Sequence, residues 1–358
     1  MENNQKNNKL IEEAIRRIAE HPLDPNNYLL LGKIYVINND YDSALGIYES
    51  LLSVDSKNVQ ALINSGSIYF CKNDFQKAIN NYSRAAELDT NNISVYFNLG
   101  NAYAETGDFN KSLSNYLKAL NLDKNNASIC SAIGLLYQDN KEYVESKIYY
   151  DKAYNIEPEN VENILNLAYI TMKLYKFEEA IELFLKALKY DDKNVKTILC
   201  IANAYSAICK YATANEYFES ALMLKPDYIQ ALICYAISLC EQDNTDRAIE
   251  LYLRAIECDK TNSNPRILLG NLYCSVSRYD DAINMYKSVI EMDKDLASAY
   301  VLLANTYVMK EELKSAIQTY KKAIDIDGDN DETKLIYLEM ADEFINRKFA
   351  ALNAKGEG

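Results

Sequence analysis

The chain has 358 residues, a formal net charge of −14 and 49% hydrophobic residues, enough for a large core. The acidic balance argues against non-specific binding to nucleic acid or to an anionic membrane, because both require a cationic surface. Ten glycines and five prolines favour long helices joined by short turns over a β-rich fold. No signal segment and no apolar run of membrane-spanning length occurs, so we expect a cytoplasmic protein.

Residues 1–24 are predicted to form a polar N-terminus followed by one capping helix. Within Lys9–Glu20 the apolar residues recur at helical spacing: Leu10, Ile11, Ala14, Ile15, Ile18 and Ala19. The prolines at positions 22 and 25 end this helix, because proline cannot continue one. We expect the helix to cover the first end of the structure that follows.

A fixed period of 34 residues begins at Pro25 and continues to residue 330, which makes nine units without insertion or deletion. The eighth place of every unit is glycine or alanine: Gly32, Gly66, Gly100, Gly134, Ala168, Ala202, Ala236, Gly270 and Ala304. A constant period of this length is typical of stacked repeats. The sequence therefore predicts an all-α solenoid of stacked helix pairs.

Each unit is predicted to contain two helices, the first over about the third to fourteenth places and the second over the seventeenth to thirtieth. The turn between them reads Asn39-Asp40 in the first unit and Gly107-Asp108 in the third. The joint between units ends in asparagine at most positions, for example Asn58 and Asn126. Such residues suit short connections between helices.

Each unit carries small residues and large aromatic residues at fixed places. The twentieth place is always small, and the twenty-fourth is aromatic in all nine units: Tyr48, Tyr82, Tyr116, Tyr150, Phe184, Phe218, Tyr252, Tyr286 and Tyr320. Small residues let two helix axes approach, and rings fill the space beside them. The tyrosines are therefore interpreted as core residues and not as catalytic groups.

This pattern resembles the tetratricopeptide repeat family over residues 25–330. The residues that carry the resemblance are Tyr96, Leu99, Gly100, Tyr103, Ala78, Tyr82 and Ala85, with Pro158 and Pro226 at unit joints. The family's tryptophan at the fourth place is absent, because the chain has no tryptophan. The resemblance implies a right-handed superhelix of antiparallel helix pairs, with nine units making slightly more than one turn.

The resemblance also implies that the first helix of each unit lines a concave groove, through its second, fifth, sixth, ninth, twelfth and thirteenth places. Asparagines recur at two of these, the sixth and ninth places of the unit: Asn64, Asn98, Asn166, Asn101, Asn203, Asn271 and Asn305. An asparagine amide complements a peptide bond, and an asparagine row of this kind holds peptides in relatives that resemble the nucleocytoplasmic GlcNAc transferase. The alternative is that these amides are solvated or serve packing.

Charged residues give the predicted groove an acidic middle, at Glu105, Asp139 and Glu162. Basic residues follow toward the C-terminal half at Lys173, Lys196 and Arg266. Segregated charges can orient a peptide by complementarity, although exposed charges are also commonly just solvated. The fifth places are almost all apolar, and they either contact the neighbouring unit or favour apolar side chains of a ligand.

Several sharper functions are not supported by the residues. A carboxylate clamp needs converging cations, whereas the fifth place never carries lysine or arginine. No phosphate loop, nucleophile elbow or metal-ligand spacing occurs, so we expect neither an enzyme, a cofactor nor a metal site. The eight cysteines include no C-x-x-C pair and are interpreted as small buried residues. A helical RNA-binding repeat has a basic groove, which this acidic chain lacks.

Residues 331–358 are predicted to form a C-terminal capping helix with a polar tail. Its apolar residues recur at helical spacing: Leu335, Tyr337, Leu338, Met340, Ala341, Phe344 and Ile345. The alternative is that the terminal helices dock onto a second copy and make a homo-oligomer. We expect a non-catalytic protein–protein interaction scaffold that binds a partner's peptide segment in its groove. The alternative function is a recognition or assembly subunit for a separate catalytic protein, for example a glycosyltransferase.

Overall fold

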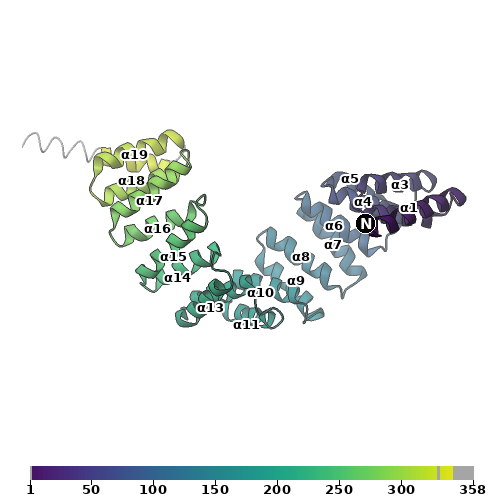
Figure 1. Ribbon diagram of the computed structural model, residues 1–358, viewed down its shortest axis with the longest axis horizontal. Coiled ribbons are helices and arrows are strands. Elements are labelled where there is room, and N and C mark those ends of the chain that lie inside the picture. Colours follow the sequence, from purple (N-terminus) through teal and green to yellow (C-terminus); the bar gives the residue numbers. More distant parts are fainter. Residues whose placement is uncertain (1, 329–330, 342–358) are drawn as a thin grey trace, which may run out of the picture. The chain divides into compact units, whose positions relative to one another are not determined.

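The computed structural model describes residues 2–328 and 331–341, with side chains from residue 9 onward, and no strand occurs within these ranges (Figure 1). The all-α prediction is therefore confirmed. Two compact units divide the chain, Met1–Ala187 and Leu188–Gly358. We call them the N-terminal unit and the C-terminal unit, and refer to each 34-residue segment as a repeat.

The N-terminal unit contains eleven helices within its described residues, and α1 to α10 pack in sequence order. Their bounds are α1 Glu2–Glu20, α2 Pro25–Ile37, α3 Tyr41–Val54, α4 Val59–Cys71, α5 Phe75–Leu88, α6 Ile93–Glu105, α7 Phe109–Leu122, α8 Ala127–Asp139, α9 Tyr143–Ile156, α10 Val161–Lys173 and α11 Phe177–Leu188. Even-numbered helices are the first helices of repeats and odd-numbered ones from α3 are the second.

The C-terminal unit continues the same alternation in the residues that the structure describes. Its helices are α12 Val195–Ala207, α13 Tyr211–Leu224, α14 Ile229–Glu241, α15 Thr245–Cys258, α16 Asn264–Ser275, α17 Tyr279–Met292, α18 Ala297–Met309 and α19 Leu313–Ile326. Residues 331–341 are also helical. Ile336, Tyr337 and Met340 pack against the buried cluster of Ala304, Ala316 and Tyr320, whereas Leu335 and Leu338 are exposed. The predicted positions Phe344 and Ile345 lie outside the described residues.

First helices begin earlier than the third place that the sequence suggested, and in five repeats the asparagine at the joint is the N-cap. The Asn58 side chain accepts a hydrogen bond from the Ala61 backbone N–H at 3.0 Å, so α4 starts at the first place of its repeat. The amide of Asn58 also donates to Asp55 at 3.1 Å. Asn92, Asn126 and Asn194 cap α6, α8 and α12 in the same way. One side chain thus satisfies a free helix N–H and holds the joint.

The turn inside each repeat depends on a left-handed residue at the fifteenth place. Every repeat has a positive φ there, from 57° at Asp243 to 75° at Gly107. Gly107 adopts this conformation without cost, whereas Lys141, with φ at 63°, has a Cβ that disfavours it. The following aspartate caps the second helix in three repeats, as Asp108 does by accepting from the Lys111 backbone N–H at 3.1 Å.

The core of each repeat is the predicted contact between small and aromatic residues. The ring at the twenty-fourth place is at most 3% exposed in every repeat. Where the eighth place is glycine, a Cβ would meet that ring: at Gly100 it would lie 2.4 Å from the Tyr116 ring. The small residue at the twentieth place adds a hydrogen bond in two repeats, since the Ser112 hydroxyl donates to the Gly100 carbonyl at 2.8 Å.

Basic side chains also connect successive repeats, a feature that the sequence columns did not reveal. Lys186 of α11 donates to the carbonyl of Pro158 at 2.7 Å, across the joint of the preceding repeats. Arg254 of α15 makes the equivalent bond to the carbonyl of Pro226 at 3.1 Å. In both cases a residue at the twenty-sixth place binds the thirty-second place of the repeat before it.

The cysteines differ from the expectation that they are buried. Cys130 is buried, but Cys71, Cys209 and Cys258 are exposed, because they lie at helix ends or in a turn. At the N-terminal end of the chain, Ile18 of α1 packs against Tyr28 and Leu51. None of the described helices combines the length and the apolar character needed to cross a bilayer.

Candidate functional site

The first helices of the N-terminal unit line two hollows. One, the N-terminal hollow, lies at α2, α3 and α4 and has a volume of about 530 Å³. The other, the central hollow, lies at α4, α6, α7 and α8 and has a volume of about 460 Å³. Most lining residues come from the sixth, ninth, twelfth and thirteenth places of first helices. We call the surface that carries both hollows the first-helix face.

The N-terminal hollow is mainly apolar and has a single cation at its rim. Leu30 and Val36 of α2 face Ile68 of α4 across it, and Lys33 is its only charged lining residue. Asn64 also lines it, and its side-chain oxygen accepts a hydrogen bond from Gln60 at 2.9 Å. The Asn64 side chain also forms a hydrogen bond with Tyr48, so it is already engaged by two residues of the chain.

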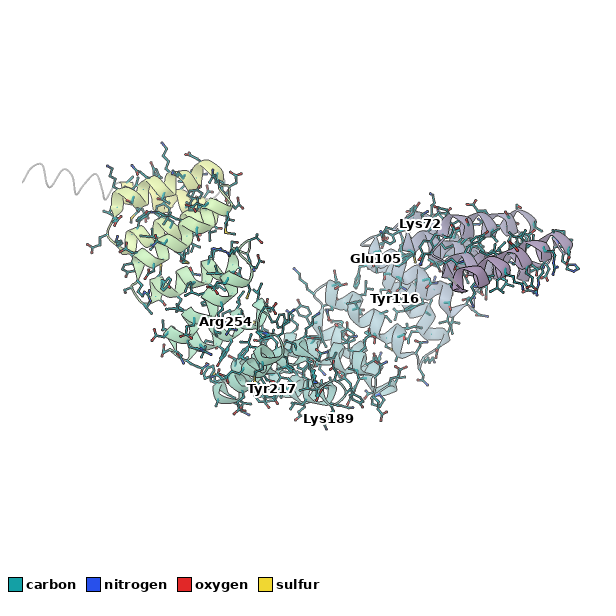
Figure 2. All side chains as sticks on the ribbon, viewed as in Figure 1. Lys72, Glu105, Tyr116, Lys189, Tyr217 and Arg254 are labelled. Atoms are coloured by element: carbon teal, nitrogen blue, oxygen red, sulfur yellow. The ribbon has the colours of Figure 1, made fainter. Side chains whose placement is uncertain are left out.

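The central hollow combines an apolar floor with an acidic rim. Phe70 of α4, Ala132 and Leu135 of α8 form part of its wall, and Leu135 is 49% exposed. Glu105 and Asp139, at the thirteenth places of α6 and α8, supply its only charged lining residues. Glu105 and Tyr116 are both labelled in Figure 2.

Tyr116 at the base of the central hollow is held by a hydrogen bond to Asn101. Its hydroxyl donates to the Asn101 side-chain oxygen at 2.6 Å. Burial raises the pKa of Tyr116 to about 12, and the Glu105 carboxylate adds to this rise. The hydroxyl therefore stays protonated at neutral pH and remains a donor to Asn101.

The ninth-place asparagines have a structural partner that the sequence did not predict. As at Asn101, the side-chain oxygens of Asn271 and Asn305 accept hydrogen bonds from the hydroxyls of Tyr286 and Tyr320. In each case the tyrosine lies fifteen residues ahead in the same repeat. These three asparagines can still donate N–H groups to a ligand, but their oxygens are already engaged.

The fourth ninth-place asparagine, Asn203, lies where the aromatic residue is Phe218, which has no hydroxyl. Burial raises the pKa of Cys234, and hydrogen bonds from Gln230 and Asn203 oppose this rise. At the sixth place, Asn64 lines the N-terminal hollow, whereas Asn98 and Asn166 are half-buried and line neither hollow. The predicted asparagine row is thus not a uniform set of free amides.

The predicted cations are not brought together. Lys173 is exposed in the last turn of α10, in the N-terminal unit. Lys196 is exposed in the C-terminal unit, where it lines a shallow hollow with Lys225 and Tyr228. Arg266 was wrongly placed among the groove positions: it occupies the fourth place of its repeat, and its guanidinium donates to the carbonyl of Asn262 at 2.9 Å.

The sequence reasoning missed Phe70, Ala132 and Leu135 as wall residues of the central hollow. Ala132 and Leu135 occupy sixth and ninth places where other repeats carry asparagine, and a search for recurring polar residues passes over them. The signal in the sequence was that these two places of the fourth repeat depart from asparagine. Because Ala132 and Leu135 are not asparagine, this part of the wall is apolar and carries no side-chain amide, while Glu105 and Asp139 supply the charge of the hollow.

Comparison with known proteins identifies the repeats. Family models described as TPR repeat or tetratricopeptide repeat match residues 25–58, 66–107, 100–141, 127–160, 161–194, 251–284 and 276–335. No curated protein sequence matches the chain. The crystal structure of yeast Tom70 is similar, with a TM-score of 0.53 and 16% identity over 99% of this chain and 96% of that one.

A tetratricopeptide repeat protein from Parabacteroides merdae ATCC 43184 is similar to part of the chain. Its TM-score is 0.50 at 20% identity, and the match covers 69% of this chain and 98% of that one. The crystal structure of MamA matches at a TM-score of 0.43 and 24% identity, over 46% of this chain and 97% of that one. At 16% and 20% identity, the yeast Tom70 and Parabacteroides merdae structures support the fold alone.

Proposed function

Because the chain belongs to the tetratricopeptide repeat family, whose fold serves protein–protein interaction, we propose that its first-helix face binds a peptide segment of a partner protein. The chain itself acts as a non-catalytic scaffold. The observation that carries this proposal is the pair of hollows on that face, with volumes of about 530 and 460 Å³. Sites of this size with apolar walls and a few polar groups are typical of ligand-binding surfaces.

The chemistry of the hollows favours a peptide over RNA. Apolar side chains such as Leu30 and Leu135 are 43% and 49% exposed there, which leaves apolar area available for burial by a ligand. The carboxylates of Glu105 and Asp139 would repel a phosphate backbone at the central hollow. A recognition subunit for a separate catalytic protein would use the same face, and its partner segment would then belong to an enzyme.

The test is selection of peptides from a displayed random library on the full chain, followed by affinity measurement with fluorescence anisotropy. Leu30→Asp combined with Leu135→Asp places a charge in each hollow and should weaken selected peptides by at least about tenfold. The matched control combines Val144→Asp with Ile148→Asp, two residues of α9 that are 60% and 49% exposed and line neither hollow.

Retained affinity in the control and lost affinity in the hollow variant would support the proposal. Equal affinity for the two double variants, or the absence of any enriched peptide, would overturn it. Circular dichroism of each variant checks that the helical fold is intact.

A further inference from the structure

The central hollow has an unbalanced charge that nothing in its own wall compensates. Glu105 and Asp139 both line it, and no lysine or arginine does. Neither carboxylate forms an ion pair with any residue that the structure describes. The nearby Lys111 is already committed, since its ammonium lies 2.8 Å from Asp108 and over the ring of Tyr103.

The remaining wall of the central hollow suits a long apolar stem. Leu135, Phe70 and Phe109 present apolar surface beside the two carboxylates. Asn101 accepts a hydrogen bond from the Tyr116 hydroxyl and still offers this hollow its N–H donors. A ligand that fits must therefore carry positive charge at its tip, apolar groups behind the tip and an acceptor along its length.

We propose that the central hollow binds an arginine of the partner peptide, with its guanidinium between Glu105 and Asp139 and a flanking apolar residue against Leu135. This rests on the proposed function, because the arginine is part of the segment that the first-helix face takes. Arginine fits better than lysine, since its planar fork pairs with two carboxylates and stacks on aromatic rings. Its methylene stem covers the apolar wall, as long basic side chains commonly do.

The N-terminal hollow provides an internal contrast. Its only charged lining residue is Lys33, so it does not attract a cation. A peptide that crosses both hollows therefore meets opposite charges at its two ends, which fixes the direction in which it lies. The arginine preference belongs to the central hollow alone.

The test uses fluorescein-labelled glycine–serine peptides with a central Leu-Arg-Leu, and matched peptides with citrulline or glutamate in place of arginine. Citrulline keeps the shape of the side chain and removes its charge. We expect the citrulline peptide to bind the wild-type chain about tenfold more weakly or worse, because a charge-assisted hydrogen bond is lost. Binding of the arginine peptide should weaken as salt increases, since the carboxylates are exposed.

The variant Glu105→Gln/Asp139→Asn should lower affinity for the arginine peptide by a similar factor and abolish its advantage over citrulline. The reversed variant Glu105→Lys/Asp139→Lys should prefer the glutamate peptide. Lys33→Gln is the control and should retain the arginine preference. Melting curves of the variants should match the wild type, because neither carboxylate has an ion-pair partner in the described residues to lose.

Equal binding of the arginine and citrulline peptides, or no measurable binding of either, would overturn the arginine assignment. Library peptides that depend on Leu30 and Leu135 but carry no basic residue would overturn it too, while the proposed peptide binding would stand. Loss of the arginine preference in Lys33→Gln would place the basic side chain in the wrong hollow and also reject the proposal.

Discussion

Five repeats carry glycine at the eighth place because a tyrosine ring of the second helix occupies the space of a side chain. At Gly100 a Cβ would lie 2.4 Å from the Tyr116 ring, and at Gly134 it would lie 2.8 Å from the Tyr150 ring. Contacts this short force the ring to move. In these five repeats glycine therefore fits the position of the ring, whereas alanine stands beside the buried Tyr252 and Tyr320 in two other repeats. The greater freedom of glycine in the unfolded chain is a cost that the contact offsets.

Gly100→Ala should destabilise its repeat by about 1–3 kcal/mol, because the added methyl overpacks the Tyr116 ring. Hydrogen exchange of α6 and α7 measures the loss. Gly46→Ala is the control: Gly46 lies within α3 with nothing within 4 Å of its Cβ position. That substitution should stabilise α3 by up to about 1 kcal/mol, since alanine is the better helix former. Unchanged protection in Gly100→Ala would contradict the steric argument.

Lys141→Gly should stabilise the fourth repeat by about 1 kcal/mol. Lys141 has a φ of 63°, and glycine adopts this left-handed conformation without the Cβ penalty. Gly107→Ala is the reciprocal change and should destabilise the third repeat by a similar amount, because nothing lies within 4 Å of its Cβ position and only the backbone conformation opposes it. Denaturant titration monitored by hydrogen exchange measures the change in stability of each variant. The same sign for both changes would contradict this explanation.

Asn101→Ala should destabilise the third repeat by about 1–3 kcal/mol, because the buried Tyr116 hydroxyl loses its acceptor. Tyr116→Phe removes the hydroxyl and should cost less, and the double variant should lie near Tyr116→Phe alone. Asn98→Ala is the control, since Asn98 has no such tyrosine partner among the hydrogen bonds of the described residues. Additive effects of the two changes would show that this hydrogen bond contributes little.

Neighbouring repeats are joined by single side chains as well as by apolar packing. Lys186 of α11 donates to the Pro158 carbonyl at 2.7 Å and to the Tyr154 hydroxyl at 2.8 Å, and its ammonium lies 4.6 Å from the centre of the Tyr154 ring. The helix α11, which carries Lys186, therefore also stabilises the joint between the fourth and fifth repeats. This bond crosses 28 residues of sequence, so no local pattern reveals it.

Lys186→Met keeps the apolar stem and removes the donors, so it should weaken the packing of α11 on α9 by about 1 kcal/mol. The control is Lys189→Met: Lys189, labelled in Figure 2, is exposed and makes no ion pair or hydrogen bond within the described residues. Hydrogen exchange at the joint around Pro158 should rise only in Lys186→Met. Equal exchange in the two variants would mean that the bond does not hold the joint.

The helix pairs followed from the 34-residue period, because each repeat satisfies its own backbone and its small–aromatic contact lies within one repeat. Most first helices begin two residues before the third place that the sequence suggested, and α16 begins one residue before it. Asparagine serves equally well in a turn or as an N-cap, so the sequence did not fix these starts. The bond between Asn101 and Tyr116 joins two helices, so it needed the folded geometry. The central hollow arises from exceptions at Ala132 and Leu135, which a search for recurring residues passes over.

Within the two compact units, the helices α1–α10 and α12–α19 pack mainly on their neighbours in sequence. Long-range contacts that would couple distant repeats are therefore few, and stability is close to a sum of repeat and joint contributions. A single global free energy of unfolding then describes the molecule poorly. Damage in one repeat should remain near it.

Leu99→Ala should lower the stability of the third repeat by about 2–5 kcal/mol, because Leu99 is only 4% exposed and leaves a cavity. The loss of hydrogen-exchange protection should concentrate in α5–α8 and leave α16–α19 unchanged. Leu269→Ala, at a residue with 0% exposure in α16, is the reciprocal control and should affect the C-terminal unit. A uniform loss of protection along the chain in either variant would contradict local unfolding.

The asparagine caps at the joints have a consequence for how such a chain changes in length. Asn58 forms hydrogen bonds with the helix that follows it and with the aspartate three residues before it. All the residues that form this joint are therefore close together in the sequence. Removing or duplicating a segment of the gene that encodes 34 residues would join two repeats through a joint of the same kind. The number of repeats can thus change by recombination while each helix pair that begins with an asparagine cap keeps that cap.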